Sequence, residues 1–200
     1  MEALLGLAVG LALSTAAGLR VFIPLLLTGL AGRLGYLTLT PGMSWLASDV
    51  ALLALATATL LEVGAYYVPW LDNVLDTMAP PVAATAGIIA TAAVTPELSP
   101  FLRWTLAIIV GGGMAGLVQV GTAMLRLKSS AFTGGIGNPV LATTELMGSL
   151  ALSALALLAP FLALAAALAC LALLAWRLAI MRRWRRAAAT YPGSSRPSRR

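Results

Sequence analysis

Two glutamates, Glu62 and Glu145, stand inside long apolar stretches of the sequence. Ionisable groups within a membrane segment are rare, and they commonly face a bundle interior or a wet cavity, where they carry protons or ions. Asp72 and Asp76 follow Glu62 at an i, i+4 spacing, and Lys128 precedes Glu145. These residues predict one polar face that binds a small ion or an anionic solute, with Glu62 or Glu145 carrying a proton or cation. The alternative is that the charges pair for packing alone.

The stretch SAFTGGIGNPVLATTE at residues 130–145 joins two apolar segments. Its Asn138-Pro139 pair predicts a helix start, with Asn138 at the N-cap and Pro139 at the first helical position. The simplest interpretation is a loop that begins the next helix. The functional interpretation is that free N–H groups around Gly135, the Thr133 hydroxyl and Lys128 hold an anion. The glycine spacing fits neither a P-loop nor a dinucleotide fingerprint.

Arg20 is the one basic residue deep in an early apolar stretch. We expect it near the outer side of the membrane, with Asp49 as the first candidate partner and Glu62 as the second. A paired or snorkelling arginine needs no function, because its long stem reaches the interface.

Several kinds of site are excluded by residue type. The chain has no histidine and a single cysteine, Cys170, which lies in the apolar run ALACLALL. A His/Cys zinc site, a haem-binding histidine, a Ser-His triad and an intrachain disulfide are therefore ruled out. We expect no cofactor, no metal site and no enzymatic activity.

The composition predicts an integral membrane protein with an all-α, polytopic fold. Apolar residues make up 60% of the 200 residues and charged residues only 10%, against about 25% charged in soluble domains. Hydropathy predicts about six spans, near residues 4–31, 48–68, 79–95, 101–125, 139–159 and 161–181. Three precede and three follow the linker at 96–100, as an inverted repeat requires.

The first predicted span is too long for one straight crossing. Its 28 residues, 4–31, would reach about 40 Å at 1.5 Å per residue. We expect it either to tilt strongly or to break near residues 14–18, which would give a broken or re-entrant first helix. The second span begins more simply, because Ser48 can cap it with Asp49 in the first turn.

Charge predicts the orientation and the domain boundary. Residues 182–200 hold seven arginines and no acid, so residues 1–181 are read as the bundle and 182–200 as a basic, disordered cytoplasmic tail. An even number of spans then places both termini in the cytoplasm. The loops with Arg126 and Lys128 and with Asp72 and Asp76 fall on the same side. We expect anionic lipid, and not nucleic acid, to bind the cluster Arg182, Arg183, Trp184, Arg185 and Arg186.

In the fourth span, small residues recur every four residues, the spacing that allows close helix packing. Gly112 and Gly116 are four residues apart, which lets a second helix approach closely, either within the chain or in a homo-oligomer. Gln119 and Thr122 are three apart on one side of the same helix and can bond across that interface.

Three segments resemble a bacterial membrane family named domain of unknown function 4126. YYVPWLDNVLDTMAPPVAATAG is similar to its Pro-x-x-Asp-x-x-x-Asp run with a following proline, and AAGLRVFIPLLLTGL resembles its first helix. RLKSSAFTGGIGNPVLATTE resembles a later segment of the family. The resemblance covers about residues 1–180 and implies a membrane bundle without supplying a substrate. It marks the matching residues Pro69, Asp72, Asp76, Pro81, Lys128, Gly135, Asn138, Pro139 and Glu145.

Three functions are compatible with these features. The leading hypothesis is a small secondary transporter or channel in the bacterial cytoplasmic membrane, with its polar site on the cytoplasmic half. The alternative is a non-transporting scaffold or assembly factor whose glycine faces bind partner helices. The third is a lipid-modifying enzyme that uses Asp72 and Asp76 with a divalent cation, although such sites normally need more oxygen ligands.

Overall fold

The computed structural model describes residues 1–65, 69–134 and 136–189, with the backbone alone for 69–77, 174 and 177–189. Within these ranges the chain is helical and contains no strand, which confirms the all-α prediction. The helices are α1 (Glu2–Leu19), α2 (Phe22–Arg33), the 3₁₀ helix η1 (Pro41–Ala47), α3 (Asp49–Ala65), α4 (Pro69–Ala93), α5 (Pro100–Leu106), the π-helical turn η2 (Ala107–Gly112), α6 (Gly113–Thr133), α7 (Asn138–Leu158) and α8 (Pro160–Ala189).

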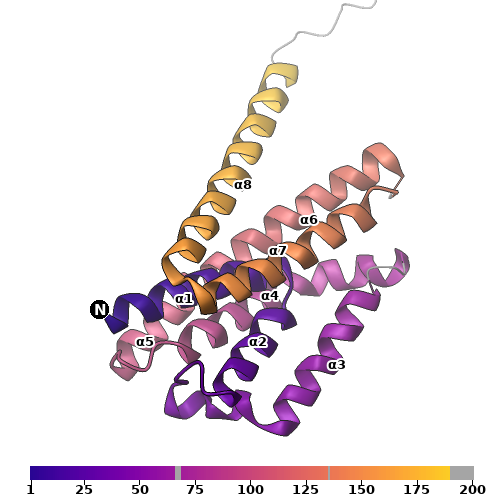
Figure 1. Ribbon diagram of the computed structural model, residues 1–200. Coiled ribbons are helices and arrows are strands. Elements are labelled where there is room, and N and C mark those ends of the chain that lie inside the picture. Colours follow the sequence, from indigo (N-terminus) through magenta and orange to yellow (C-terminus); the bar gives the residue numbers. More distant parts are fainter. Residues whose placement is uncertain (66–68, 135, 190–200) are drawn as a thin grey trace, which may run out of the picture.

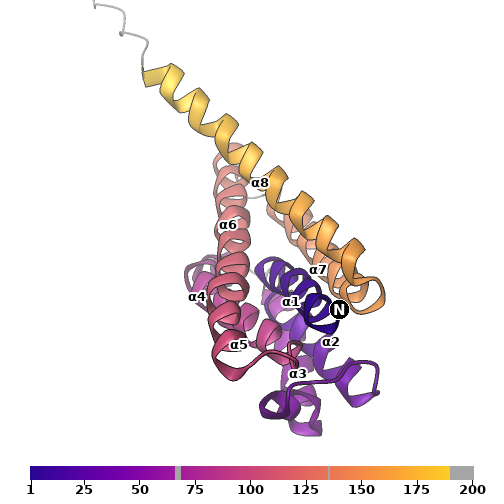
Figure 2. The same cartoon turned by 90° about the vertical axis from the view of Figure 1, so that its left-hand side faces the viewer.

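The N-terminal helix α1 lies at the centre of the bundle. It packs against α4, α6, α7 and α8 (Figures 1 and 2). A helix that is apolar all round is suited to such a position, and every residue from 8 to 18 except Leu11 is buried. The later helices therefore assemble around the first one.

Small residues on α1 allow this close packing. Gly6, Gly10, Ser14 and Gly18 recur every four residues, so they share one stripe of the helix. A Cβ atom added at Gly10 would lie 3.2 Å from Thr91 of α4, and one at Gly18 would lie 2.5 Å from the Ala115 carbonyl oxygen of α6. Larger side chains would push these helices apart.

The first apolar stretch breaks at Arg20, between α1 and α2. Arg20 has extended backbone angles, φ −145° and ψ 126°. Pro24 lies four residues later and explains the position of the break. Proline lacks the N–H that would bond to the carbonyl of residue 20, and its ring clashes with that carbonyl in a continuous helix. The predicted break is thus confirmed, two residues beyond the predicted interval of 14–18.

The break places the N-terminus beside the turn between α4 and α5. Glu2 and Gly6 line a cavity of about 280 Å³ together with Thr38, Thr95 and Glu97. The α6–α7 connection lies at the opposite end of the bundle, and α8 extends toward that opposite end (Figures 1 and 2). If the long helices cross the membrane lengthwise, the N-terminus and the end of α8 face opposite sides. The prediction that both termini share the cytoplasmic side stays a prediction, and this arrangement does not favour it.

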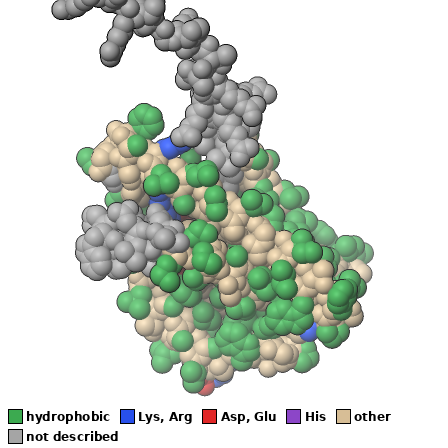
Figure 3. Space-filling view, turned by 180° about the vertical axis from the view of Figure 1, so that it is seen from behind, with side chains coloured by type: hydrophobic (Ala, Val, Ile, Leu, Met, Phe, Trp, Pro, Cys, Tyr) green, Lys and Arg blue, Asp and Glu red, His purple; other side chains and the backbone are tan. Residues whose placement is uncertain are grey.

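The described helices are those of a multi-pass membrane protein. Glu2–Leu19, Pro100–Thr133 and Asn138–Leu158 are long and apolar enough to span a bilayer, and the pair Pro41–Ala47 and Asp49–Ala65, bent by 62°, would add a fourth span. Large hydrophobic side chains such as Leu53, Ile109 and Leu117 are exposed, and apolar side chains are spread over the face in Figure 3. Six crossings and the 3+3 inverted repeat remain predictions.

Three helix boundaries differ from the sequence prediction. Helix α4 begins at Pro69, so the predicted cytoplasmic loop before residue 79 is helical. Helix α6 continues to Thr133, which brings Arg126 out of the predicted loop and into a helix. Helix α8 continues to Ala189, so residues 182–189 of the predicted disordered tail are helical, and 190–200 lie outside the described residues. In each case the helix continues beyond its hydrophobic stretch.

The glycines of the π-helical turn and early α6 pack within the chain. A Cβ atom at Gly112 would lie 2.9 Å from Ile88 of α4, and one at Gly116 would lie 3.9 Å from Ala84. The Gly112–Gly116 stripe is therefore used against α4, and a homo-oligomer through these residues remains only a prediction. The predicted N-terminal cap of α3 is confirmed, because the Ala51 N–H donates to the Ser48 hydroxyl at 3.2 Å.

Candidate functional site

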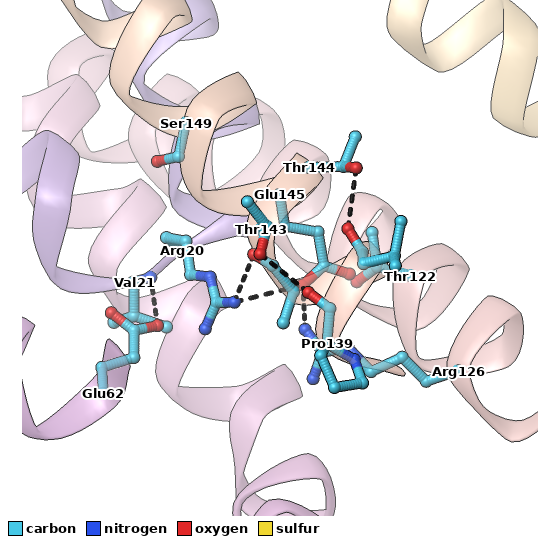
Figure 4. A network of polar contacts seen from close by, with 12 residues as sticks. Arg20, Val21, Glu62, Thr122, Arg126, Pro139, Thr143, Thr144, Glu145 and Ser149 are labelled. Carbon is cyan, nitrogen blue, oxygen red and sulfur yellow. Dashed lines mark hydrogen bonds and ion pairs between the residues drawn. The ribbon is translucent and has the colours of Figure 1, made fainter. Parts of the chain in front are cut away.

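Two arginines and a glutamate meet inside the bundle. Arg20 comes from the break after α1, Arg126 from α6 and Glu145 from α7 (Figure 4). Arg20 is 2% exposed, Arg126 1% and Glu145 7%. The sequence folds this way locally because Pro24 ends α1 at Arg20 while α6 and α7 each continue through their charged residue without a break.

Both arginines approach the same carboxylate oxygen. The Arg126 Nη2 donates a hydrogen bond to Glu145 Oε2. The Arg20 Nη2 lies 3.8 Å from that oxygen and donates to the Ala142 carbonyl oxygen at 2.7 Å. Ala142 precedes Glu145 by almost one helical turn, so α7 offers Arg20 both a backbone acceptor and a carboxylate. The geometry is that of a single anion held by two guanidinium groups.

Glu62 of α3 binds the first N–H groups of α2, at the start of the helix. Its Oε1 accepts a hydrogen bond from the Val21 N–H at 2.9 Å, and its Oε2 accepts one from the Phe22 N–H at 3.3 Å. The first N–H groups of a helix have no partner within the helix, and a carboxylate there also interacts favourably with the helix dipole. Glu62 therefore caps the start of α2 and stabilises the break after α1. Arg20 lies between Glu62 and Glu145 in Figure 4.

The charges of the described cluster balance. Arg20 and Arg126 carry two positive charges, and Glu62 and Glu145 carry two negative charges when ionised. Removing one member of a buried charge pair leaves an uncompensated charge and is strongly destabilising. A charged solute that enters this site must therefore replace one of the charged groups, so that the net charge of the cluster stays balanced. Two guanidinium groups around one exchangeable carboxylate are suited to a small anion.

An apolar cavity opens beside the broken helix. Val21 and Phe22, whose N–H groups bind Glu62, also line a space of about 310 Å³ between α2 and α4. The remaining lining residues are Leu25, Pro81, Val82, Thr85, Ala86 and Ile89. Val21 and Phe22 thus connect the Glu62 carboxylate to this cavity.

The glycine-rich loop is separate from the buried charges. Thr133 is exposed; its hydroxyl donates to the Ser129 carbonyl at 2.7 Å and accepts from the Gly137 N–H at 3.1 Å. Gly137 is the N-cap of α7, so Asn138 stands one position later than predicted, and its amide donates to the Ser130 hydroxyl at 2.9 Å. The Ile136 N–H is also bonded, to the Thr133 carbonyl. The Gly137 and Ile136 N–H groups are thus used within the loop, and the anion site predicted around Gly135 stays a prediction.

Four other predicted site residues lie on α4, near the end of α6 and in the loop before α7. Lys128 is partly buried near the end of α6 and has an interaction with another part of the chain. Asp72 and Asp76 lie on α4, and their side chains are outside the described residues. Gly135 also lies outside the described residues. Among the described side chains, no group of three or more carboxylate or thiol ligands could hold a metal ion.

The first predicted partner of Arg20, Asp49, was wrong, and Arg126 was missed as a site residue. Asp49 instead pairs with Arg33 at 2.7 Å on the surface. Asp49 was chosen because both residues were expected near the outer side of the membrane, whereas the break after α1 places Arg20 beside α7. Arg126 was assigned to a loop, although Gln119, Thr122 and Arg126 share one helical face at i, i+3 and i+7 spacing. That spacing was the signal that could have placed Arg126 inside the bundle.

Comparison with known families identifies the chain's relatives. Residues 7–179 match the family described as domain of unknown function (DUF4126). The chain belongs to this family. The match covers Arg20, Glu62, Arg126 and Glu145, and it confirms the resemblance inferred from the three sequence segments. Comparisons with curated proteins and with solved structures found no match.

Proposed function

We propose that this DUF4126 protein is a small secondary transporter or channel for a small anion, and that Arg20 and Arg126 bind the anion. The observation that carries the proposal is the convergence of two buried guanidinium groups on one carboxylate oxygen, next to a broken helix. Ionisable residues buried in a membrane bundle mark solute and ion pathways by default, and broken helices are where transporters bind solutes.

The site suggests how charge balance limits binding. Arginine stays protonated in proteins, whereas a carboxylate can accept a proton. When Glu145 accepts a proton and leaves Arg126, an incoming monovalent anion restores the balance of the cluster. Glu62, held by two backbone N–H groups, keeps Arg20 partly compensated during the exchange. The proposal is therefore a proton-linked anion carrier, with the site nearer the α6–α7 end of the bundle, which we assign to the cytoplasmic side of a bacterial inner membrane.

One observation favours the alternative of a non-transporting scaffold. Glu145 is paired with both arginines and almost fully buried, as expected for charges that serve packing alone. The glycine stripes of α1 and η2, however, are used within the chain and are not presented to a partner helix. The structure as described fits a closed state of a carrier, and flux decides between the two functions.

The test is anion flux in proteoliposomes. Purified protein is reconstituted, and uptake of chloride, nitrate, acetate and phosphate is followed with a pH-sensitive dye inside the vesicles, with and without an inward proton gradient. We expect at least one anion to enter faster than in empty vesicles, and the gradient to accelerate its entry. Arg126→Gln should abolish this flux.

A matched control separates loss of transport from loss of an arginine. Arg33→Gln removes a surface arginine that is also paired with an acid, Asp49, and should leave flux unchanged. Each variant is first shown to be monodisperse after solubilisation. Failure of every anion to move faster than in empty vesicles, in folded wild-type protein, would favour the scaffold.

A further inference from the structure

Polar side chains continue from the charged cluster along α6 and α7. On α6, Gln119, Thr122 and Arg126 lie on one face at i, i+3 and i+7 spacing. On α7, Glu145, Ser149 and Ser153 recur every four residues on one face. From Arg126 to Gln119 the rise is about 10 Å, and from Glu145 to Ser153 it is about 12 Å. Both rows run from the charged cluster toward the end of the bundle that holds the N-terminus (Figure 1).

All members of the two rows are buried. Ser149 and Ser153 are 0% exposed, Gln119 2% and Thr122 4%. Both helices pack on α1, and the Ser149 hydroxyl donates to the Ala16 carbonyl oxygen at 3.0 Å. The Thr122 hydroxyl donates to the Gln119 carbonyl oxygen within its own helix, at 3.1 Å. Each of these hydroxyl oxygens retains the capacity to accept a further hydrogen bond.

Two of the buried groups have no hydrogen-bond partner among the described residues. These are the amide nitrogen of Gln119 and the hydroxyl of Ser153, at the far ends of their rows. A buried polar group without a partner is costly, and buried water commonly bonds to polar groups that the protein leaves unsatisfied. In a membrane bundle, an apolar residue would fill either position at lower cost.

We infer that these two rows line a hydrated path from the Glu145 cluster toward the N-terminal end of the bundle, and that water or a small hydrated ion occupies it. The path extends the proposed transport function, since a buried anion site needs a route to each side of the membrane. Gln119 and Ser153 act at its far end by bonding to water, and Thr122 and Ser149 act between them and the charged residues.

Cysteine accessibility tests the path without knowledge of a substrate. Cys170 is the chain's only cysteine, so Cys170→Ala gives a background without thiols. Gln119→Cys and Ser153→Cys are made in it and exposed to a small, membrane-impermeant methanethiosulfonate in proteoliposomes. Leu117→Cys and Leu150→Cys are the matched controls, because both leucines are exposed on the outer faces of the same helices, at 67% and 45%.

We expect the two path cysteines to react at least about ten-fold faster than the controls, because the thiolate is the reactive form and is disfavoured in hydrocarbon. Equal rates at path and control positions overturn the path. If Gln119→Cys does not fold, Thr122→Cys, which is nearly isosteric, replaces it on α6. If the path cysteines are labelled but the protein transports no anion, the path is supported and the proposed transport is contradicted. Flux without labelling shows that the solute takes another route.

Discussion

At the scale of single residues, Glu145 is the member of the cluster on which the others depend. Its Oε2 is shared by Arg20 and Arg126, so two buried cations meet at one carboxylate oxygen. Replacing it by an isosteric amide keeps the volume and removes the charge.

Glu145→Gln should lower the free energy of unfolding by about 3 kcal/mol, because two buried arginines lose the negative charge that they share. The measurement is denaturant unfolding of the purified protein in detergent. Thr144→Ala is the control, since Thr144 is the exposed neighbour whose hydroxyl bonds only to the Val140 carbonyl of its own helix. An unchanged stability for Glu145→Gln would show that the arginines are compensated elsewhere.

Glu62→Ala should destabilise the protein by about 1–2 kcal/mol, because two N–H groups at the start of α2 lose their acceptor and the helix dipole loses a negative charge. Glu62→Gln should cost less, since the amide oxygen can still accept from one of these N–H groups. Thermal unfolding of both variants measures the order. If the two substitutions have the same effect, the carboxylate does not act as the cap of α2.

At the scale of the helices, close packing is set by glycines that have no room for a side chain. A Cβ atom at Gly87 of α4 would lie 2.6 Å from the Ala115 Cβ of α6 and would also meet the Gly111 carbonyl. Gly113 lies nearby in the chain, and no atom is within 4 Å of a Cβ added there. The two positions have the same residue type and opposite surroundings.

Gly87→Ala should therefore destabilise the bundle by about 1–3 kcal/mol through overpacking. Gly113→Ala should be neutral or stabilising by up to about 1 kcal/mol, because alanine has the higher helix propensity. Unfolding midpoints in detergent compare the two directly. A similar effect at both positions would mean that α4 and α6 can separate without loss.

The helices were predictable from the sequence, whereas their connections were not. Apolar runs correctly placed helical segments, and Pro24 marked the region of the first break. The return of the chain at Arg20 was not predictable from hydropathy, because α1 and α2 form one continuous apolar run. The pairing of Arg20 with Glu145 depends on that return. The stripe of Gly6, Gly10, Ser14 and Gly18 was present in the sequence and would have indicated a central α1.

At the scale of the whole molecule, the arrangement predicts the sidedness of the termini. The end of α8, which includes Arg182, Arg183, Arg185 and Arg186, extends toward the α6–α7 connection. The N-terminus lies at the other end (Figure 2). Basic flanks stay in the cytoplasm. A reporter that fluoresces only in the cytoplasm should be active when fused after residue 200 and inactive when fused before residue 1. Activity at both ends would restore the prediction of two cytoplasmic termini and require α1 to lie otherwise in the membrane.

The central position of α1 also has a consequence for biosynthesis. The ribosome makes this helix first, yet α4, α6, α7 and α8, which enclose it, are made afterwards. Until they arrive, Ser14 lacks its partners on α4, and Arg20 lacks Glu145 and the Ala142 carbonyl of α7. We therefore expect the N-terminal segment to remain in the insertion machinery or at the membrane surface at first. Helix α1 would reach its final packing only after the last helices have been inserted. Truncated chains that lack α7 and α8 should therefore leave the Arg20 region accessible to proteases.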